Sequence, residues 1–186
     1  MRLPLHALTL VTLVTLLTAV ALAAPAGAQT ARVRIGIIGH QGPVAVDSLA
    51  TIVTIGAPAG ATFAAVSRVF TEELRIPVDS RDSLRGVVGV SSVARMRTFA
   101  NARISRWLNC GSGITGLNAD NWRVFVTAFA FVDRADSAST TLRLAIVGGA
   151  RDVAGSSTEP VACGSNGTFE SLVAERVKVN LGLPAR

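Results

Sequence analysis

Residues 111–116 carry a glycine spacing known from nucleotide-binding sites. They read Gly-Ser-Gly-Ile-Thr-Gly, a match to the G-x-G-x-x-G pattern whose backbone cradles a pyrophosphate. That chemistry requires a strand before the glycines and a helix after them, inside a βαβ unit. Here Cys110 precedes the glycines, and a polar run from Asn118 to Asp120 leads into a strand-like segment. We therefore interpret residues 111–116 as a flexible turn and expect no nucleotide cofactor.

Titratable side chains of the kinds used in acid–base catalysis are few. His40 is the sole histidine beyond the first 28 residues, which excludes a multi-histidine metal site there, and it lies in a glycine-rich turn. The pairs Asp79 with Asp82 and Asp133 with Asp136 are of the type that glycosidases use, but both stand in polar runs where acids form turns. We predict no catalytic residue and no metal site. A hydrolase with an atypical site built from His40 and an aspartate is the alternative.

The sequence contains two cysteines, Cys110 and Cys163, each followed by glycine and other turn-forming residues. An even number of cysteines in an exported chain predicts a disulfide. The bridge would close a loop of 53 residues and stabilise the fold by about 4 kcal/mol if its effect is entropic. The alternative is a reactive thiol.

Arginines gather between Asp82 and Asp120, where no acidic residue intervenes. Such a cluster can attract phosphate groups of anionic lipid, lipopolysaccharide or another polyanion of the bacterial envelope. Nucleic acid is a poor choice of partner outside the cytoplasm. A run of one charge more often serves to keep a surface solvated, and we retain that alternative. We expect Trp107, beside Arg106, to add an amphipathic edge to this surface. The predicted binding residues are Arg95, Arg97, Arg103, Arg106 and Trp107, with Arg85 upstream of them.

The first 28 residues have the pattern of a secretory signal peptide. Arg2 supplies a positive start, residues 7–24 are uncharged and mostly apolar, and Pro25 precedes the small-x-small site Ala26-Gly27-Ala28. We predict cleavage after Ala28, no transmembrane segment in the mature chain, and a periplasmic or extracellular location. The alternative is an uncleaved membrane anchor, because an apolar run of about 18 residues reaches the spanning length.

The composition fits a single exported domain over residues 29–186. Seventeen of the 18 basic residues are arginine, and Tyr is absent, a bias typical of GC-rich bacterial genomes. The arginine excess is therefore weak evidence for an anionic partner. Loss of Arg2 with the signal peptide lowers the formal net charge from +6 to +5. The remaining 158 residues suffice for one domain with a sizeable core.

Alternation of apolar and polar residues predicts the strands. Residues 32–37 and 49–55 are β-rich, and we expect them to pair as a hairpin across the turn that holds His40. Residues 87–90 predict a short strand. Residues 121–133 and 140–147 predict the clearest strands, joined by a polar loop into an antiparallel hairpin. Both alternating faces of the first of these two strands are apolar, so we predict that it is central and covered on each side.

Apolar residues at helical spacing predict two helices. One begins near Pro58 and stops before Pro77, and its apolar stripe consists of Phe63, Val66, Phe70 and Leu74. The other covers residues 169–181, with Thr168 as its cap and Gly182 at its end.

Residues 93–108 fit either a helix or a strand followed by one helical turn, and we favour the strand with a turn. The order of all these elements predicts an α+β fold. We expect an antiparallel sheet of about five to seven strands with two main helices packed on it, closed by one disulfide.

The run Ser105-Arg106-Trp107-Leu108-Asn109-Cys110-Gly111-Ser112-Gly113 carries a resemblance, together with Asn118-Ala119-Asp120 and Cys163. It is similar to predicted exported proteins of unknown function from GC-rich bacteria. The resemblance covers about residues 49–181. It implies export and a fold with paired cysteines, and no activity.

Two classes of function remain open on the sequence. The first is a non-enzymatic envelope protein that binds a partner protein, an anionic lipid or a polysaccharide. The second is the hydrolase with an atypical site. Invariance of His40 and an aspartate among homologues would favour the hydrolase, whereas invariance confined to glycines, cysteines and core positions would favour the binding protein.

Overall fold

The computed structural model describes residues 33–36, 43–46, 51–155 and 157–185. The predicted signal peptide and the turn that holds His40 lie outside these residues. No helix of the described ranges is long and apolar enough to cross a membrane. The elements in chain order are β1 (Val33–Gly36), β2 (Pro43–Val46), β3 (Thr51–Ile55), α2 (Ala59–Arg68), the π-helical turn η2 (Val69–Glu73), β4 (Ser80–Asp82), β5 (Val87–Met96), β6 (Thr98–Phe99), β7 (Ala102–Arg103), the 3-10 turn η3 (Ile104–Arg106), β8 (Leu108–Asn109), β9 (Ser112–Gly113), β10 (Gly116–Leu117), α3 (Asn118–Asn121), β11 (Arg123–Arg134), β12 (Thr140–Arg151), β13 (Val161–Ser165) and α4 (Thr168–Asn180).

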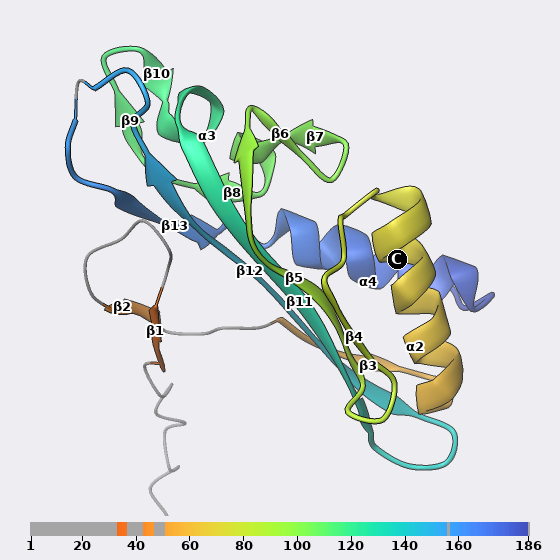
Figure 1. Cartoon of the computed structure of the whole chain (residues 1–186). Coiled ribbons are helices and arrows are strands. Elements are labelled where there is room, and N and C mark those ends of the chain that lie inside the picture. The colour runs from red at the N-terminus through yellow and green to blue at the C-terminus, as the bar shows by residue number, and fades with distance from the viewer. Residues whose placement is uncertain (1–32, 37–42, 47–50, 156, 186) are drawn as a thin grey trace, which may run out of the picture. The chain divides into compact units, whose positions relative to one another are not determined.

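A seven-stranded antiparallel sheet forms the centre of the fold and confirms the predicted α+β class. Its strands follow the order β4-β5-β11-β12-β13-β8, and β3 also pairs with β12. The helices α2 and α4 lie on the same side of this sheet, where they contact β11, β12 and each other (Figure 1). Among the described elements, helices thus cover only one face of the sheet.

The longest strands, β11 and β12, form the predicted antiparallel hairpin. Their register runs without interruption from the pair Arg123 and Arg151 to the pair Arg134 and Thr140. The strand β12 continues four residues beyond the predicted end at residue 147, because Gly148 and Ala150 pair with β13 as well as with β11. The hairpin therefore extends along the whole sheet.

Alternation along β11 separates a buried face from a half-exposed one. Val124, Val126 and Ala128 are fully buried against the helices. The phenylalanines of the other face are only half-buried, so the prediction that both faces are covered is wrong for the single chain. We call this second surface the Phe face. It comprises Val87, Phe125, Phe129, Phe131, Ala145 and Val147, with Ile52 and Met96 at its margins.

The first predicted helix is confirmed as α2 with its continuation η2. Pro58 precedes the first helical residue, where its fixed backbone angle suits a helix start. Val66, Phe70 and Leu74 of the predicted stripe are buried, while Phe63 is half-buried. The helical backbone ends at Leu74, three residues before Pro77.

The C-terminal helix α4 closes the core. The ring of Phe169 lies 5.9 Å from Trp107, 6.1 Å from Phe70 and 6.3 Å from Phe99, measured between ring centroids, and all four side chains are buried. The prediction that Thr168 caps this helix is wrong: Gly167 occupies the cap position with a φ of 82°, and Thr168 is the first helical residue. Gly182 follows the helix end in a left-handed conformation, as predicted.

Two further predictions concern pairing. The hairpin expected between residues 32–37 and 49–55 is wrong, because β1 pairs with β2 whereas β3 pairs with β12. In residues 93–108 the favoured strand followed by a helical turn is confirmed by β5 and η3. Between them the structure adds the small hairpin β6–β7, whose turn residues Ala100 and Asn101 have φ values of 49° and 59°. Positive φ at both central residues is typical of a type I′ turn.

Candidate functional site

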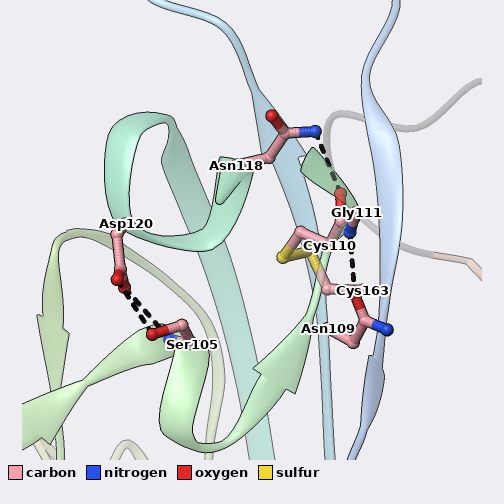
Figure 2. Close-up of a disulfide and its surroundings, with 7 residues drawn as sticks. All are labelled: Ser105, Asn109, Cys110, Gly111, Asn118, Asp120 and Cys163. Atoms are coloured by element: carbon pink, nitrogen blue, oxygen red, sulfur yellow. Dashed lines mark hydrogen bonds between the residues drawn. A yellow bond between two sulfur atoms is a disulfide. The ribbon is translucent and has the colours of Figure 1, made fainter. Parts of the chain in front are cut away.

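The cysteines form the predicted disulfide. Cys110 and Cys163 are bonded with 4.2 Å between their Cα atoms, and both residues are buried (Figure 2). Cys110 follows β8, and Cys163 lies in β13, the strand that pairs with β8. The reactive-thiol alternative is therefore wrong. The bridge holds the edge of the sheet to the loop that carries the glycine motif.

The glycine motif forms a turn, as the sequence analysis proposed. Residues 112–113 and 116–117 pair as the two short strands β9 and β10, and Gly111 has a φ of 72°. The Asn118 side-chain nitrogen donates to the Cys110 carbonyl at 3.1 Å, and the Gly111 backbone N–H donates to the Asn109 side-chain oxygen at 2.9 Å (Figure 2). These bonds tie the turn to the disulfide. The helix that follows, α3, has only four residues and is too short to present a phosphate site.

Beside this turn, a serine and an aspartate contact each other directly. The Ser105 hydroxyl donates to Asp120 at 2.8 Å, and the Ser105 backbone N–H donates to the same carboxylate at 3.1 Å (Figure 2). The Arg103 guanidinium lies 3.7 Å from the same Asp120 oxygen that accepts the Ser105 hydroxyl. Asp120 thereby fixes the start of η3 and neutralises Arg103. No histidine belongs to the described residues, so this contact lacks the imidazole that links serine and aspartate in a Ser-His-Asp triad.

The two sequence-adjacent carboxylate pairs are used by turns and by an ion pair. Asp82 accepts hydrogen bonds from the backbone N–H groups of residues 84 and 85, and Asp136 from those of residues 138 and 139. Asp133 forms an ion pair with Arg143 at 2.7 Å. Within the described ranges no three acidic, cysteine or histidine side chains gather in a way that would hold a metal ion.

Asp79, like Asp136, accepts three hydrogen bonds. Burial alone would raise the pKa of its carboxyl group, but hydrogen bonds outweigh it and lower the pKa below the ordinary aspartate value. The donors are the backbone N–H and the hydroxyl of Ser91, both at 2.9 Å, and the hydroxyl of Ser80 at 3.0 Å. The pKa of Asp136 is lowered as well, mainly because the Ser139 hydroxyl donates to it. Both carboxylates stabilise loops rather than standing ready to transfer protons.

A groove of about 310 Å³ lies next to the disulfide, lined by residues that include Ser105, Asn109 and Asn166. Its polar side chains already serve the fold. The Asn166 side-chain nitrogen donates to the Arg106 carbonyl at 2.8 Å, and Asn109 and Ser105 hold the contacts described above. The groove therefore lies where β8 meets the residues just before α4, and its polar side chains hold these two segments in place.

The predicted basic residues lie together at one end of the sheet, which we call the basic end. Arg95 is in the last part of β5 and Arg97 follows that strand; Arg103 is in β7 and Arg106 in η3. Arg97, Arg103 and Arg106 are exposed, and Arg95 is half-buried. Only Arg103 of these four has an ion pair with a described residue.

Trp107 supports this cluster from below the surface. Its side chain is 1% exposed, and its indole N–H donates to the Phe99 carbonyl at 2.8 Å. The guanidinium carbon of Arg106 lies 5.0 Å from the centroid of the Trp107 ring. The expectation that Trp107 adds an amphipathic edge to the surface thus does not match its position, and its contribution is to hold Arg106 in place by a cation–π contact.

Two arginines that sequence analysis missed extend the basic end. The register of β11 places Arg123 directly opposite Arg151 on one side and Met96 on the other. Both arginines are exposed, and neither forms an ion pair with a residue in the described part of the chain. Arg151 lies beyond the predicted strand end at residue 147, so the two arginines are brought together only by the observed length of β12. Like charges directly opposite each other in a sheet are destabilising.

Comparison with known proteins adds no assignment to this geometry. No family model, no curated protein and no solved structure matches the chain.

Proposed function

We propose that the mature chain is an exported, non-enzymatic protein that binds an anionic component of the bacterial envelope through its basic end. The observation that carries this proposal is the cross-strand pair Arg123 and Arg151, which forms no ion pair with any described residue; the partner of Arg123 on β5 is Met96, which stands between Arg95 and Arg97. An anionic group placed between two such guanidinium groups removes their mutual repulsion. The positive charge of this arginine pair would thus be neutralised by an anionic ligand.

The acids closest along the chain are already engaged. Asp120 contacts Ser105 and Arg103. Asp152, which follows Arg151 directly, is buried and accepts hydrogen bonds from the backbone N–H groups of Ala154 and Ser157. Both carboxylates thus have contacts of their own. The described arginines at this end of the sheet outnumber them.

The absence of enzymatic activity is part of the proposal, and the geometry of the acids supports it. The described carboxylates discussed above hold turns, loops or ion pairs. Lowered pKa values at Asp79 and Asp136 suit permanently charged acceptors rather than general acids at neutral pH.

Vesicle binding tests the proposal. The mature protein is mixed with vesicles of anionic phosphatidylglycerol or zwitterionic phosphatidylcholine, and bound protein is measured by co-sedimentation at low and high salt. We expect binding to the anionic vesicles only, and weaker binding at high salt because screening shortens the reach of surface charges. The double variant Arg123→Gln with Arg151→Gln should bind about thirty-fold more weakly, since each arginine near an anionic surface contributes about 1 kcal/mol.

A matched control removes two charges at the opposite end of the sheet. Arg81 in β4 and Arg134 at the end of β11 are exposed there, and Arg81→Gln with Arg134→Gln should bind as the wild type does. A second variant replaces Arg95, Arg97, Arg103 and Arg106 by glutamine and should also lose binding while its circular dichroism stays unchanged. Equal loss in the control, or wild-type binding that ignores salt, would contradict the assignment of the basic end.

A further inference from the structure

We propose that the anionic partner of the basic end is the surface of a phospholipid bilayer, and that the turn between β9 and β10 inserts its tip into that surface. This inference deepens the proposed function and rests on it, because it names the anionic component. It is carried by the exposed apolar side chains, which gather beside the unpaired arginines.

Exposed apolar side chains are concentrated at the basic end. Soluble proteins tolerate single exposed apolar residues anywhere on their surface, whereas a local group of them requires an explanation. Ile114 is fully exposed, and Met96, Leu117 and Val153 are about half exposed. These four lie at the basic end, in the β9–β10 turn, at the end of β5 and just after β12. The other exposed large apolar residues of the described chain are Ile52, Leu84 and Val179, which lie in β3, in the β4–β5 turn and in α4.

The β9–β10 turn holds Ile114 at its tip. Gly113 pairs with Gly116, so the two residues between them form the loop of this small hairpin. The Asn121 side-chain nitrogen donates to the Thr115 carbonyl at 2.8 Å, and the disulfide anchors the base of the turn. Because the turn is fixed from two sides, insertion of its tip requires little additional ordering of the chain.

The tip of the turn adjoins the unpaired arginines. Asn121, which holds the turn, precedes Arg123 by two residues. The register of the sheet places Met96 on one side of Arg123 and Arg151 on the other, and Val153 follows Arg151 by two residues. Figure 1 shows the β9–β10 turn at the end of the sheet where β5 and β12 finish. Apolar side chains and guanidinium groups therefore share this end of the molecule.

This combination of side chains suits the interface of an anionic bilayer. Apolar side chains can bury their carbon atoms below the headgroups, while arginines keep their guanidinium groups at the level of the lipid phosphates. Anionic lipids also give the surface a negative potential, so each arginine near it strengthens binding. The attraction of the arginines thus brings the tip of the turn to the surface that it enters.

A bilayer accounts for both kinds of side chain, whereas the other partners account for one. A soluble polyanion would pair with the arginines and leave Ile114 in water. A protein interface has a continuous apolar centre surrounded by a polar rim. At the basic end the exposed apolar residues belong to three separate segments with Arg123 and Arg151 between two of them, so the described residues form no such centre.

Vesicle binding of Ile114→Ser measures what the tip contributes. We expect this variant of the mature protein to bind phosphatidylglycerol vesicles at least about tenfold more weakly, because each buried methylene group contributes to insertion. Leu84→Ser is the matched control and should bind as the wild type does, since Leu84 is almost fully exposed at the opposite end of the sheet. If circular dichroism shows that Ile114→Ser is misfolded, Val153→Ser provides the same test.

Tryptophan fluorescence reports whether the tip enters the bilayer. Ile114→Trp and Leu84→Trp place a reporter at each end of the sheet, and the wild-type emission, which comes from Trp107 and Trp122, is subtracted. On anionic vesicles the emission of Ile114→Trp should shift to shorter wavelength and be quenched by lipids with brominated acyl chains. Leu84→Trp should show neither change.

The outcomes separate this inference from the proposed function. Wild-type protein that binds neither anionic vesicles nor soluble polyphosphate contradicts both. Binding to polyphosphate without binding to vesicles retains the proposed function and overturns the bilayer as the partner. Salt-sensitive vesicle binding that Ile114→Ser does not weaken, with no quenching of Ile114→Trp, overturns insertion of the turn, because the arginines alone would then hold the protein at the surface.

Discussion

Gly86 offers a sharp test of how the sheet edge is fixed. This residue lies in the turn between β4 and β5, is buried, and has a φ of 66°. Its carbonyl accepts the Val132 backbone N–H at 2.7 Å. A Cβ atom at this position would lie 2.2 Å from the Val132 carbonyl oxygen, which is backbone and cannot swing aside. Gly86→Ala must therefore move the turn away from β11.

The expected cost combines two effects. An alanine in the left-handed region costs roughly 1–2 kcal/mol, and relief of an overlap against a packed backbone costs roughly 1–3 kcal/mol. We expect Gly86→Ala to lower the free energy of unfolding by about 3 kcal/mol, measured by urea denaturation with the disulfide intact. Gly164 in β13 is the matched control, because nothing lies within 4 Å of a Cβ placed there.

Gly164→Ala should change the free energy of unfolding by less than about 1 kcal/mol. A small effect at Gly86, within about 1 kcal/mol of wild type, would refute the reasoning, because it would mean that the turn accommodates a side chain without cost. Equal destabilisation by both substitutions would refute it as well, since the loss would then follow from removing glycine rather than from the overlap.

Three further predictions concern processing, the disulfide and pH. Intact-mass analysis of the protein secreted by a bacterial host should show an N-terminus at Gln29; retention of residues 1–28 in a membrane fraction would contradict this. Replacing Cys110 and Cys163 by serine should lower the free energy of unfolding by up to about 4 kcal/mol in urea denaturation, since the bridge spans 53 residues. Because the pKa of Asp79 is lowered in the folded state, its stabilisation is present above the unfolded aspartate pKa of about 3.9 and is lost as pH falls through the folded pKa. Asp79→Asn should therefore be less stable than wild type by under about 1 kcal/mol at pH 7, with the difference vanishing in acid; a constant difference across pH would argue against the hydrogen bonds as its cause.

Local sequence patterns correctly predicted the elements that pair or pack with elements close to them in the sequence. The alternation in residues 121–133 and the polar loop after them predicted the β11–β12 hairpin, because a short loop leaves antiparallel pairing as the simplest arrangement. The failed hairpin shows the limit of the same rule. Residues 49–55 follow a strand and a turn closely, yet Ile55 of β3 pairs with Thr140, 85 positions later. No local sequence pattern indicates whether a strand pairs with the strand next to it in the chain or with a distant strand that has an unpaired edge.

The basic end was predicted where its arginines lie close in sequence and missed where they do not. Arg95 to Arg106 occupy one stretch, so their clustering is visible without a structure. Arg123 and Arg151 are separated by a hairpin, and they meet only because β11 and β12 keep one register over twelve residues. Trp107 shows the converse, since an aromatic beside an arginine in sequence turned out to belong to the core.

The position of Phe169 determines when this chain can complete its fold. The rings of Phe70, Phe99 and Trp107 come from three different parts of the chain, and Phe169 of α4, which contacts all three, follows them in the sequence. Both cysteines emerge before α4 does, so the partners of the disulfide are present while the core is still open. A chain with this order cannot complete its aromatic core before α4 has been added, although both cysteines are already present.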